Sequence, residues 1–66
     1  MTASQYRALL SRLGLSQVGA AKLLRVGDRT SRRWAQNGVT GTAAVVLRLL
    51  EAGTISVEDI EAVHKK

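Results

Sequence analysis

The sequence contains no cysteine, no proline and no phenylalanine, and its aromatic residues are one tryptophan and one tyrosine. The absence of cysteine excludes disulfides, cysteine-ligated metal sites and cysteine nucleophiles. No apolar run approaches the ~20 residues that a membrane-spanning helix needs, and the N-terminus lacks the charged-then-apolar pattern of a secretion signal. We therefore expect a cytoplasmic protein whose 66 residues form a single domain, residues 1–66.

Residues that could perform catalysis or bind a metal are equally scarce. The one histidine, His64, precedes two lysines at the C-terminus, where we expect a frayed end. There is no histidine–carboxylate pair, no metal-ligand spacing and no glycine-rich phosphate loop. The acidic residues Glu58, Asp59 and Glu61 fit the charged first turn and solvated face of a helix. The sequence therefore predicts no enzyme and no cofactor.

Basic residues, in contrast, are abundant and unevenly distributed. Ten lysines and arginines against five acidic residues give a net charge of +5 and an isoelectric point near 10.9. Residues 1–48 carry a net charge of +7, whereas residues 49–66 carry −2. Most of the basic residues are arginines, whose planar guanidinium suits bidentate contacts with phosphate or guanine. Beside the simpler alternative of a solvated basic surface, this charge indicates nucleic acid or an anionic membrane as partner.

Apolar residues recur every three or four positions along the chain, a pattern typical of helices and not of strands. Five short helices are expected, over residues 2–13, 17–24, 28–36, 43–52 and 57–64. Gly14 suits a left-handed helix end, and Ser56 with Asp59 resembles a capping box for the last helix. Because the connections have only three to six residues, the sequence predicts a compact all-α bundle.

One face of the third expected helix is basic. Four residues share this face at helical spacing: Arg29, Arg32, Arg33 and Gln36. The three guanidiniums repel one another, and only Asp28 is close in sequence to offset them, so a polyanion would supply the missing counter-charge. The opposite face holds Ser31, Trp34 and Ala35, from which we expect Trp34 to point into the core.

The segment from Ser16 to Trp34 resembles the helix-turn-helix of the Cro and phage-repressor (XRE-type) family. The matching residues are Gln17, Ala21, Leu24, Val26, Arg32, Arg33 and Trp34. The following Asn37-Gly38 and the apolar segment 43–50 also fit, so the resemblance covers about residues 4–53. It implies a λ-repressor-like fold with the helix-turn-helix at about residues 16–36. The second helix of the motif, about residues 28–36, would lie in the major groove of DNA.

Three positions depart from the family pattern. Arg25 replaces a turn glycine at a position that tends to need a positive φ, at a cost of about 1 kcal/mol. Gly27 replaces the usual serine or threonine cap, so we expect Asp28 to cap the third helix. Ser31 replaces an apolar residue that normally plugs this helix into the core. We expect its hydroxyl to bond back to a carbonyl one turn earlier.

The resemblance implies a set of DNA-binding residues that agrees with the charge pattern. These residues are Gln17, Lys22, Arg25, Gly27, Asp28, Arg29, Arg32, Arg33 and Gln36. Arginine can bind guanine O6 and N7, and glutamine can bind adenine. Gln17, at the positive end of the preceding helix, would contact a phosphate. The expected function is sequence-specific binding of double-stranded DNA by a small bacterial or phage transcription regulator, associated with the nucleoid.

Two questions about protein partners stay open at this point. Domains of this family also serve as antitoxins or adaptors, so a protein-interaction module with little DNA binding is the alternative function. The apolar residues of the acidic tail (Ile55, Val57, Ile60 and Val63) either complete the core or bind a partner. Because one recognition helix reads only a short half-site, we expect a weak homodimer through the fifth helix or through surplus apolar surface of the fourth. Membrane-surface binding is disfavoured, since the basic helix has only one large apolar residue.

Overall fold

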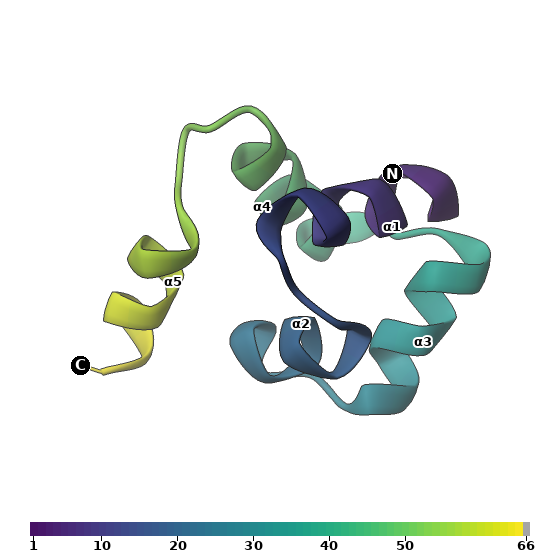
Figure 1. Ribbon diagram of the computed structural model, residues 1–66, viewed down its shortest axis with the longest axis horizontal. Coiled ribbons are helices and arrows are strands. Elements are labelled where there is room, and N and C mark those ends of the chain that lie inside the picture. Colours follow the sequence, from purple (N-terminus) through teal and green to yellow (C-terminus); the bar gives the residue numbers. More distant parts are fainter. Residues whose placement is uncertain (66) are drawn as a thin grey trace.

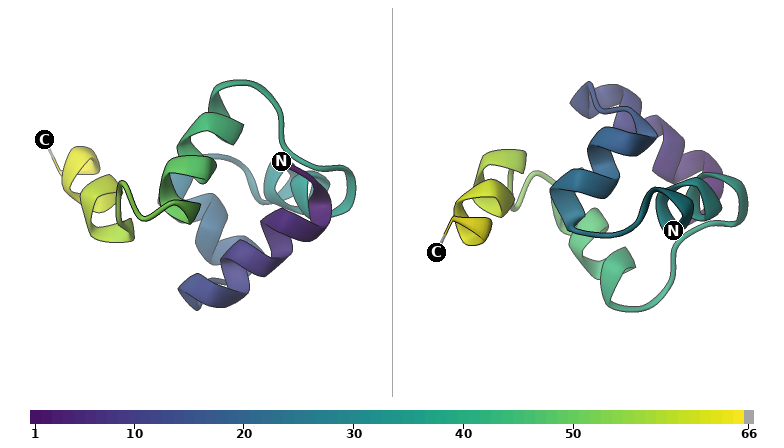
Figure 2. Two further views of the ribbon diagram at one scale, coloured as in Figure 1. Left: turned by 90° about the horizontal axis from the view of Figure 1, so that it is seen from above. Right: turned by 90° about the horizontal axis from the view of Figure 1, so that it is seen from below.

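A computed structural model describes residues 1–65, which form five α-helices and, within that range, no strand. The helices are α1 (Ala3–Leu13), α2 (Gln17–Leu24), α3 (Asp28–Asn37), α4 (Gly41–Glu51) and α5 (Val57–His64). The predicted all-helical class and the five predicted helices are confirmed. In Figures 1 and 2, α1 to α4 gather around one centre and α5 lies at one end of the molecule, after an extended connection. None of the helices in the described part of the chain has the length and apolar character of a membrane span.

The helix ends follow local sequence. Thr2 and Gln5 form a capping box at the start of α1, and Ser56 and Asp59 form the predicted one at the start of α5. The α1 helix ends at Gly14, whose φ of 71° is left-handed as predicted. Four boundaries differ from the prediction, and the first is the start of α1, which lies one residue later than expected, after the cap Thr2. The α3 helix runs one residue further than expected, and α4 begins two residues earlier, after the extended backbone of residue 40, and ends one residue earlier.

The core consists of aliphatic side chains packed around one buried tyrosine. Its fully buried members are Tyr6, Leu9, Leu10, Ala20, Ala35, Val39, Leu47 and Leu50, which come from α1 to α4 and the connection between α3 and α4. The α5 helix contributes no fully buried residue. Ile55, Val57 and Ile60 are partly buried and pack against the core, whereas Val63 is 66% exposed. Three of the four apolar residues of the acidic tail therefore complete the core. This was one of the two interpretations that the sequence left open, the other being partner binding.

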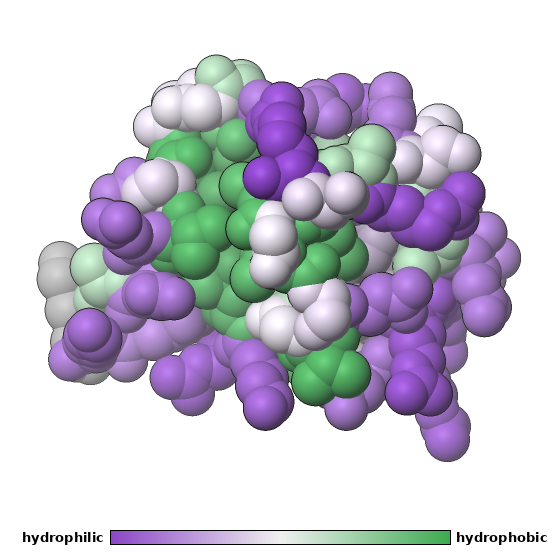
Figure 3. Space-filling model, viewed as in Figure 1, coloured by the Kyte–Doolittle hydropathy of each residue, from purple (hydrophilic) through white to green (hydrophobic). Residues whose placement is uncertain are grey.

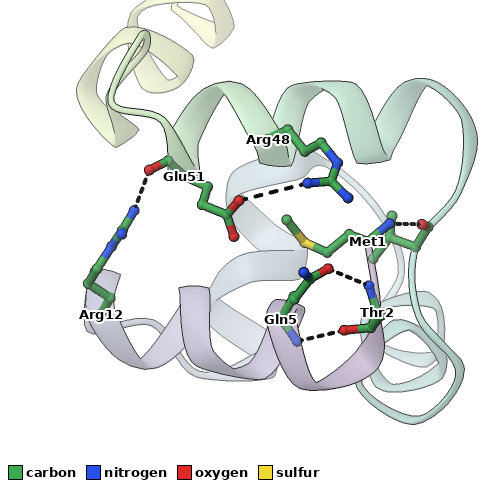
Figure 4. Close-up of polar contacts among 7 residues, drawn as sticks. Met1, Thr2, Gln5, Arg12, Arg48 and Glu51 are labelled. Atoms are coloured by element: carbon green, nitrogen blue, oxygen red, sulfur yellow. Dashed lines mark hydrogen bonds and ion pairs between the residues drawn. The ribbon is translucent and has the colours of Figure 1, made fainter.

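The α1 and α4 helices lie side by side, joined by polar contacts at both ends (Figure 4). Arg12 donates to the carbonyl oxygen of Glu51 at 2.8 Å, and Arg48 lies 3.9 Å from the Glu51 carboxylate. At the other end, the Met1 amino group donates to the Val39 carbonyl at 2.8 Å, and the Val39 N–H donates back to the Met1 carbonyl at 2.8 Å. Arg12 thus links α1 to α4, whereas the pair of Arg48 and Glu51 lies within α4 at its surface.

The end of α5 is attached to α2 and not frayed, so that expectation was wrong. His64 Nε2 lies 2.6 Å from the carbonyl oxygen of Leu23. That carbonyl belongs to the last turn of α2, where the helix stops and its final carbonyls lose their backbone partners. The imidazole of His64 supplies one such partner, and this bond spans 41 residues of sequence. Sequence reasoning could not foresee it, because the contact depends on how α5 folds back onto α2.

Candidate nucleic-acid interface

The α2 and α3 helices are connected by residues 25–27 and pack against each other. Arg25 ends α2 in the left-handed region, with φ 58° and ψ 42°, as predicted for this position. It is the only residue other than glycine with a positive φ among residues 1–65. The N–H of Val26 closes the turn by donating to the Ala21 carbonyl at 3.0 Å. A left-handed arginine is strained by about 1 kcal/mol relative to glycine, so this turn keeps a basic side chain at a cost in stability.

The start of α3 corrects one prediction. Asp28 does not cap the helix: the N-cap is Gly27, in extended conformation with φ −71° and ψ 153°, and no side chain bonds the first turn. Asp28 is instead the first helical residue, where its carboxylate still favours the positive end of the helix dipole. No atom lies within 4 Å of where a Cβ on Gly27 would stand. The turn before α3 therefore has open space beside its backbone.

All of the residues predicted to contact DNA are exposed. They are Gln17, Lys22, Arg25, Gly27, Asp28, Arg29, Arg32, Arg33 and Gln36. They all belong to α2, α3 and the turn between them. Figure 3 shows a central apolar area surrounded by hydrophilic side chains, and the side of the molecule where α3 lies is mostly hydrophilic. The structure thus brings the predicted residues onto one two-helix unit.

The lysines and arginines of α1 to α4 and their connections fall into two groups that differ in what they contact. Within residues 1–65 the only ion pair joins Arg48 to Glu51, and Arg7 and Arg12 bind backbone carbonyls. The second group, which we call the α2–α3 basic cluster, is exposed and without a carboxylate partner in the described residues. It comprises Lys22, Arg25, Arg29, Arg32 and Arg33. Positive charge that serves no contact within the fold is therefore concentrated on α2 and α3.

Buried polar groups set the rotation of α3 about its axis. Ser31 is fully buried and Ala35 nearly so, which turns the arginines at the flanking positions outward. Ser31 Oγ donates to the carbonyl of Gln17 in α2 at 2.8 Å, and the Tyr6 hydroxyl of α1 lies 2.7 Å from the same Oγ. The predicted bond from Ser31 to a carbonyl one turn earlier was wrong, because the residue stands where three helices meet and finds partners on the other two.

Trp34 also holds α3 against the core, from the inner side of the helix. The ring is partly buried and packs against the core, as predicted. It meets Tyr6 edge to face, with ring centroids 5.7 Å apart and planes at 86°, the geometry that aromatic quadrupoles favour. Burial raises the pKa of Tyr6 above its ordinary value. The phenol is therefore held in its neutral, hydrogen-bonding form behind α3.

Arg7 of α1 contacts this two-helix unit, and sequence reasoning missed it. Its guanidinium donates to the carbonyl of Ala35 near the C-terminal end of α3 and to Ser4 Oγ at 3.2 Å. A cation favours the negative end of a helix and satisfies a carbonyl there. Arg7 thus fixes the far end of α3 onto α1. The sequence offered no signal for the contact with Ala35, which lies 28 residues away.

Residues 1–65 contain no group of three or more histidine, cysteine, aspartate or glutamate side chains that could hold a metal ion. Comparisons of the chain with protein-family models, with curated proteins and with solved structures find no match. The resemblance to the Cro and phage-repressor family accordingly stays a prediction from the sequence.

Proposed function

We propose that this chain binds double-stranded DNA as a small transcription regulator, with α2 and α3 as a λ-repressor-like helix-turn-helix and α3 in the major groove. The observation that carries the proposal is the α2–α3 basic cluster, whose five cations face solvent without a carboxylate partner in the described residues. Outside the cluster, Arg7 and Arg12 donate to backbone carbonyls of other segments, and Arg48 pairs with Glu51 of its own helix.

The energetics of the cluster favour a polyanionic partner. Like charges three or four residues apart on a helix destabilise it by a few tenths of a kcal/mol per pair, and the left-handed Arg25 adds about 1 kcal/mol. A domain of this size has little stability to spare. Duplex DNA would supply the absent counter-charge, and the release of its condensed cations would drive association.

The positions along α3 divide base contacts from phosphate contacts. Arg29 and Arg32 lie nearer the start of the helix, the part that reaches base edges in helix-turn-helix complexes. Arg33 and Gln36 lie further along, and we assign Arg33 to a phosphate. Gln17 at the N-terminus of α2 would approach a second phosphate together with backbone N–H groups, and the open space beside Gly27 leaves room for the DNA backbone.

Three alanine variants test the proposal. Arg33→Ala and Arg48→Ala remove the same charge, but only Arg33 belongs to the cluster. Arg33→Ala should weaken binding to all duplexes alike and lower the log–log salt slope by about one, while Arg48→Ala should change neither. Arg32→Ala should cost about 1–3 kcal/mol and relax preference at one base position in site selection. Equal effects of Arg33→Ala and Arg48→Ala would show that net charge, and not α3, holds the DNA.

A further inference from the structure

The α4 helix has a second apolar face that the fold does not use. Four exposed residues follow one another at spacings of three, four and three along α4 and its cap: Thr42, Val45, Leu49 and Ala52. This spacing places them on one side of the helix. We call them the α4 outer stripe. Leu47 and Leu50 of the same helix are buried in the core, so the stripe faces away from it.

Large apolar side chains are rarely exposed elsewhere in this molecule. Among residues 1–65 the exposed ones are Val45 at 59%, Leu49 at 37% and Val63 at 66%. Val45 and Leu49 are four residues apart and adjoin each other on the helix surface. Val63 stands on α5, whose other large apolar residues, Val57 and Ile60, are packed against the core. The sequence left the fourth and fifth helices as alternatives for self-association, and the exposed apolar surface favours the fourth.

The charges around the stripe favour a second copy of this chain as its occupant. Two copies that each carry a net charge of +5 repel at most orientations. The α4 helix contains one basic and one acidic residue, Arg48 and Glu51, whose charged groups lie 3.9 Å apart, so this helix adds no net charge. Two copies can therefore place α4 against α4 without bringing net like charge together, whereas an acidic protein would be drawn to the α2–α3 basic cluster instead.

The stripe is also complementary to itself. When two α4 helices lie antiparallel about a two-fold axis level with Leu47, Val45 of one copy faces Leu49 of the other. In the same register Thr42 faces Ala52, so each large residue meets a large one and each small residue a small one. An isologous dimer requires this kind of matching within one patch.

From these observations we propose that the chain forms a homodimer through the α4 outer stripe, with the two α4 helices antiparallel. An 11-residue helix is only about 16 Å long, which is too short to bury the ~800 Å² per partner of a standard interface. The dimer is therefore weak in free solution. The inference rests on the proposed function in one respect: a duplex with two half-sites would hold two copies together and strengthen the contact.

Disulfide trapping tests the register directly, because the chain has no cysteine of its own. Thr42→Cys protein is mixed with Ala52→Cys protein under mild oxidation, and the rate of heterodimer formation is compared with that of homodimers of Val63→Cys. We expect the mixed pair to cross-link about tenfold faster or more, and Val45→Gln added to both partners to remove most of the advantage. Equal rates for the two kinds of dimer would overturn the proposal.

Sedimentation without DNA separates this inference from the proposed function. The wild type should show association that increases with protein concentration, Val45→Gln should shift the equilibrium toward monomer about tenfold or more, and the control Val63→Gln should match the wild type. All three chains keep the same net charge. A wild type that stays monomeric at every concentration, or a larger effect of Val63→Gln, would contradict the α4 dimer. Binding of Val45→Gln to a duplex too short for two copies then reports on the DNA proposal alone.

Discussion

The hydroxyl of Tyr6 lies 2.7 Å from Ser31 Oγ, with both side chains fully buried. Ser31 carries one hydroxyl hydrogen, which it donates to the carbonyl of Gln17, so Tyr6 is the donor in the bond between the two hydroxyls. A single chain of hydrogen bonds therefore runs from α1 through α3 to α2. These two hydrogen bonds fix which side of α3 faces outward. They therefore also fix the direction of the α3 arginines.

The direction of these bonds predicts unequal effects for two small substitutions. Ser31→Ala leaves the buried Tyr6 hydroxyl without an acceptor and should destabilise the fold by about 1–3 kcal/mol. Tyr6→Phe leaves Ser31 bound to Gln17 and should cost only about 0.5–1.5 kcal/mol. Adding Tyr6→Phe to Ser31→Ala should then recover stability, because the orphaned hydroxyl is gone. Urea unfolding followed by circular dichroism measures all three, and strictly additive losses would show that the bond is absent.

The raised pKa of Tyr6 predicts a loss of stability in alkali. Because the folded-state pKa lies above the unfolded value of about 10, the phenol's contribution is complete below that value. It is lost as the pH rises through the folded-state pKa. The free energy of unfolding of the wild type should therefore fall faster than that of Tyr6→Phe above about pH 10. The lysines are common to both proteins, so the difference belongs to Tyr6. Parallel curves would refute the assignment.

Arg25→Gly should separate stability from binding. Glycine adopts the left-handed φ of 58° without the Cβ clash, so the variant should be more stable by about 1 kcal/mol. It also removes one cation of the α2–α3 basic cluster, which should lower the salt slope of duplex binding by about one. Thermal melts and salt titrations on the same samples test both effects. A variant that melts lower than the wild type would mean that the Arg25 side chain stabilises the turn.

The elements were predictable from the sequence because helices of this kind depend on neighbours three and four residues apart. The spacing of Arg29, Arg32 and Arg33 was enough to place them on one exposed face. The capping boxes at Thr2 and Ser56 are equally local. Even the left-handed Arg25 could be foreseen from the resemblance, which implies a turn glycine, and with it a positive φ, at that position.

The sequence did not reveal the contacts between residues that lie on different helices and far apart in the chain. Ser31 was expected to bond within its own helix, yet its partners are Gln17 and Tyr6. The bonds from Arg7 to Ala35 and from His64 to Leu23 have no local pattern at all. Each depends on the angle at which two helices meet, and that angle is set by packing of the whole core.

We propose that α2 and α3 bind duplex DNA through cations that have no carboxylate partner within the described residues. The most direct measurement is the affinity of the wild-type chain for a random duplex as a function of salt concentration. With five cations in the α2–α3 basic cluster, about four to six phosphate contacts per subunit should give a log–log slope of about −4 to −5. A flat dependence on salt, or no duplex binding at about 50 mM salt, would contradict it.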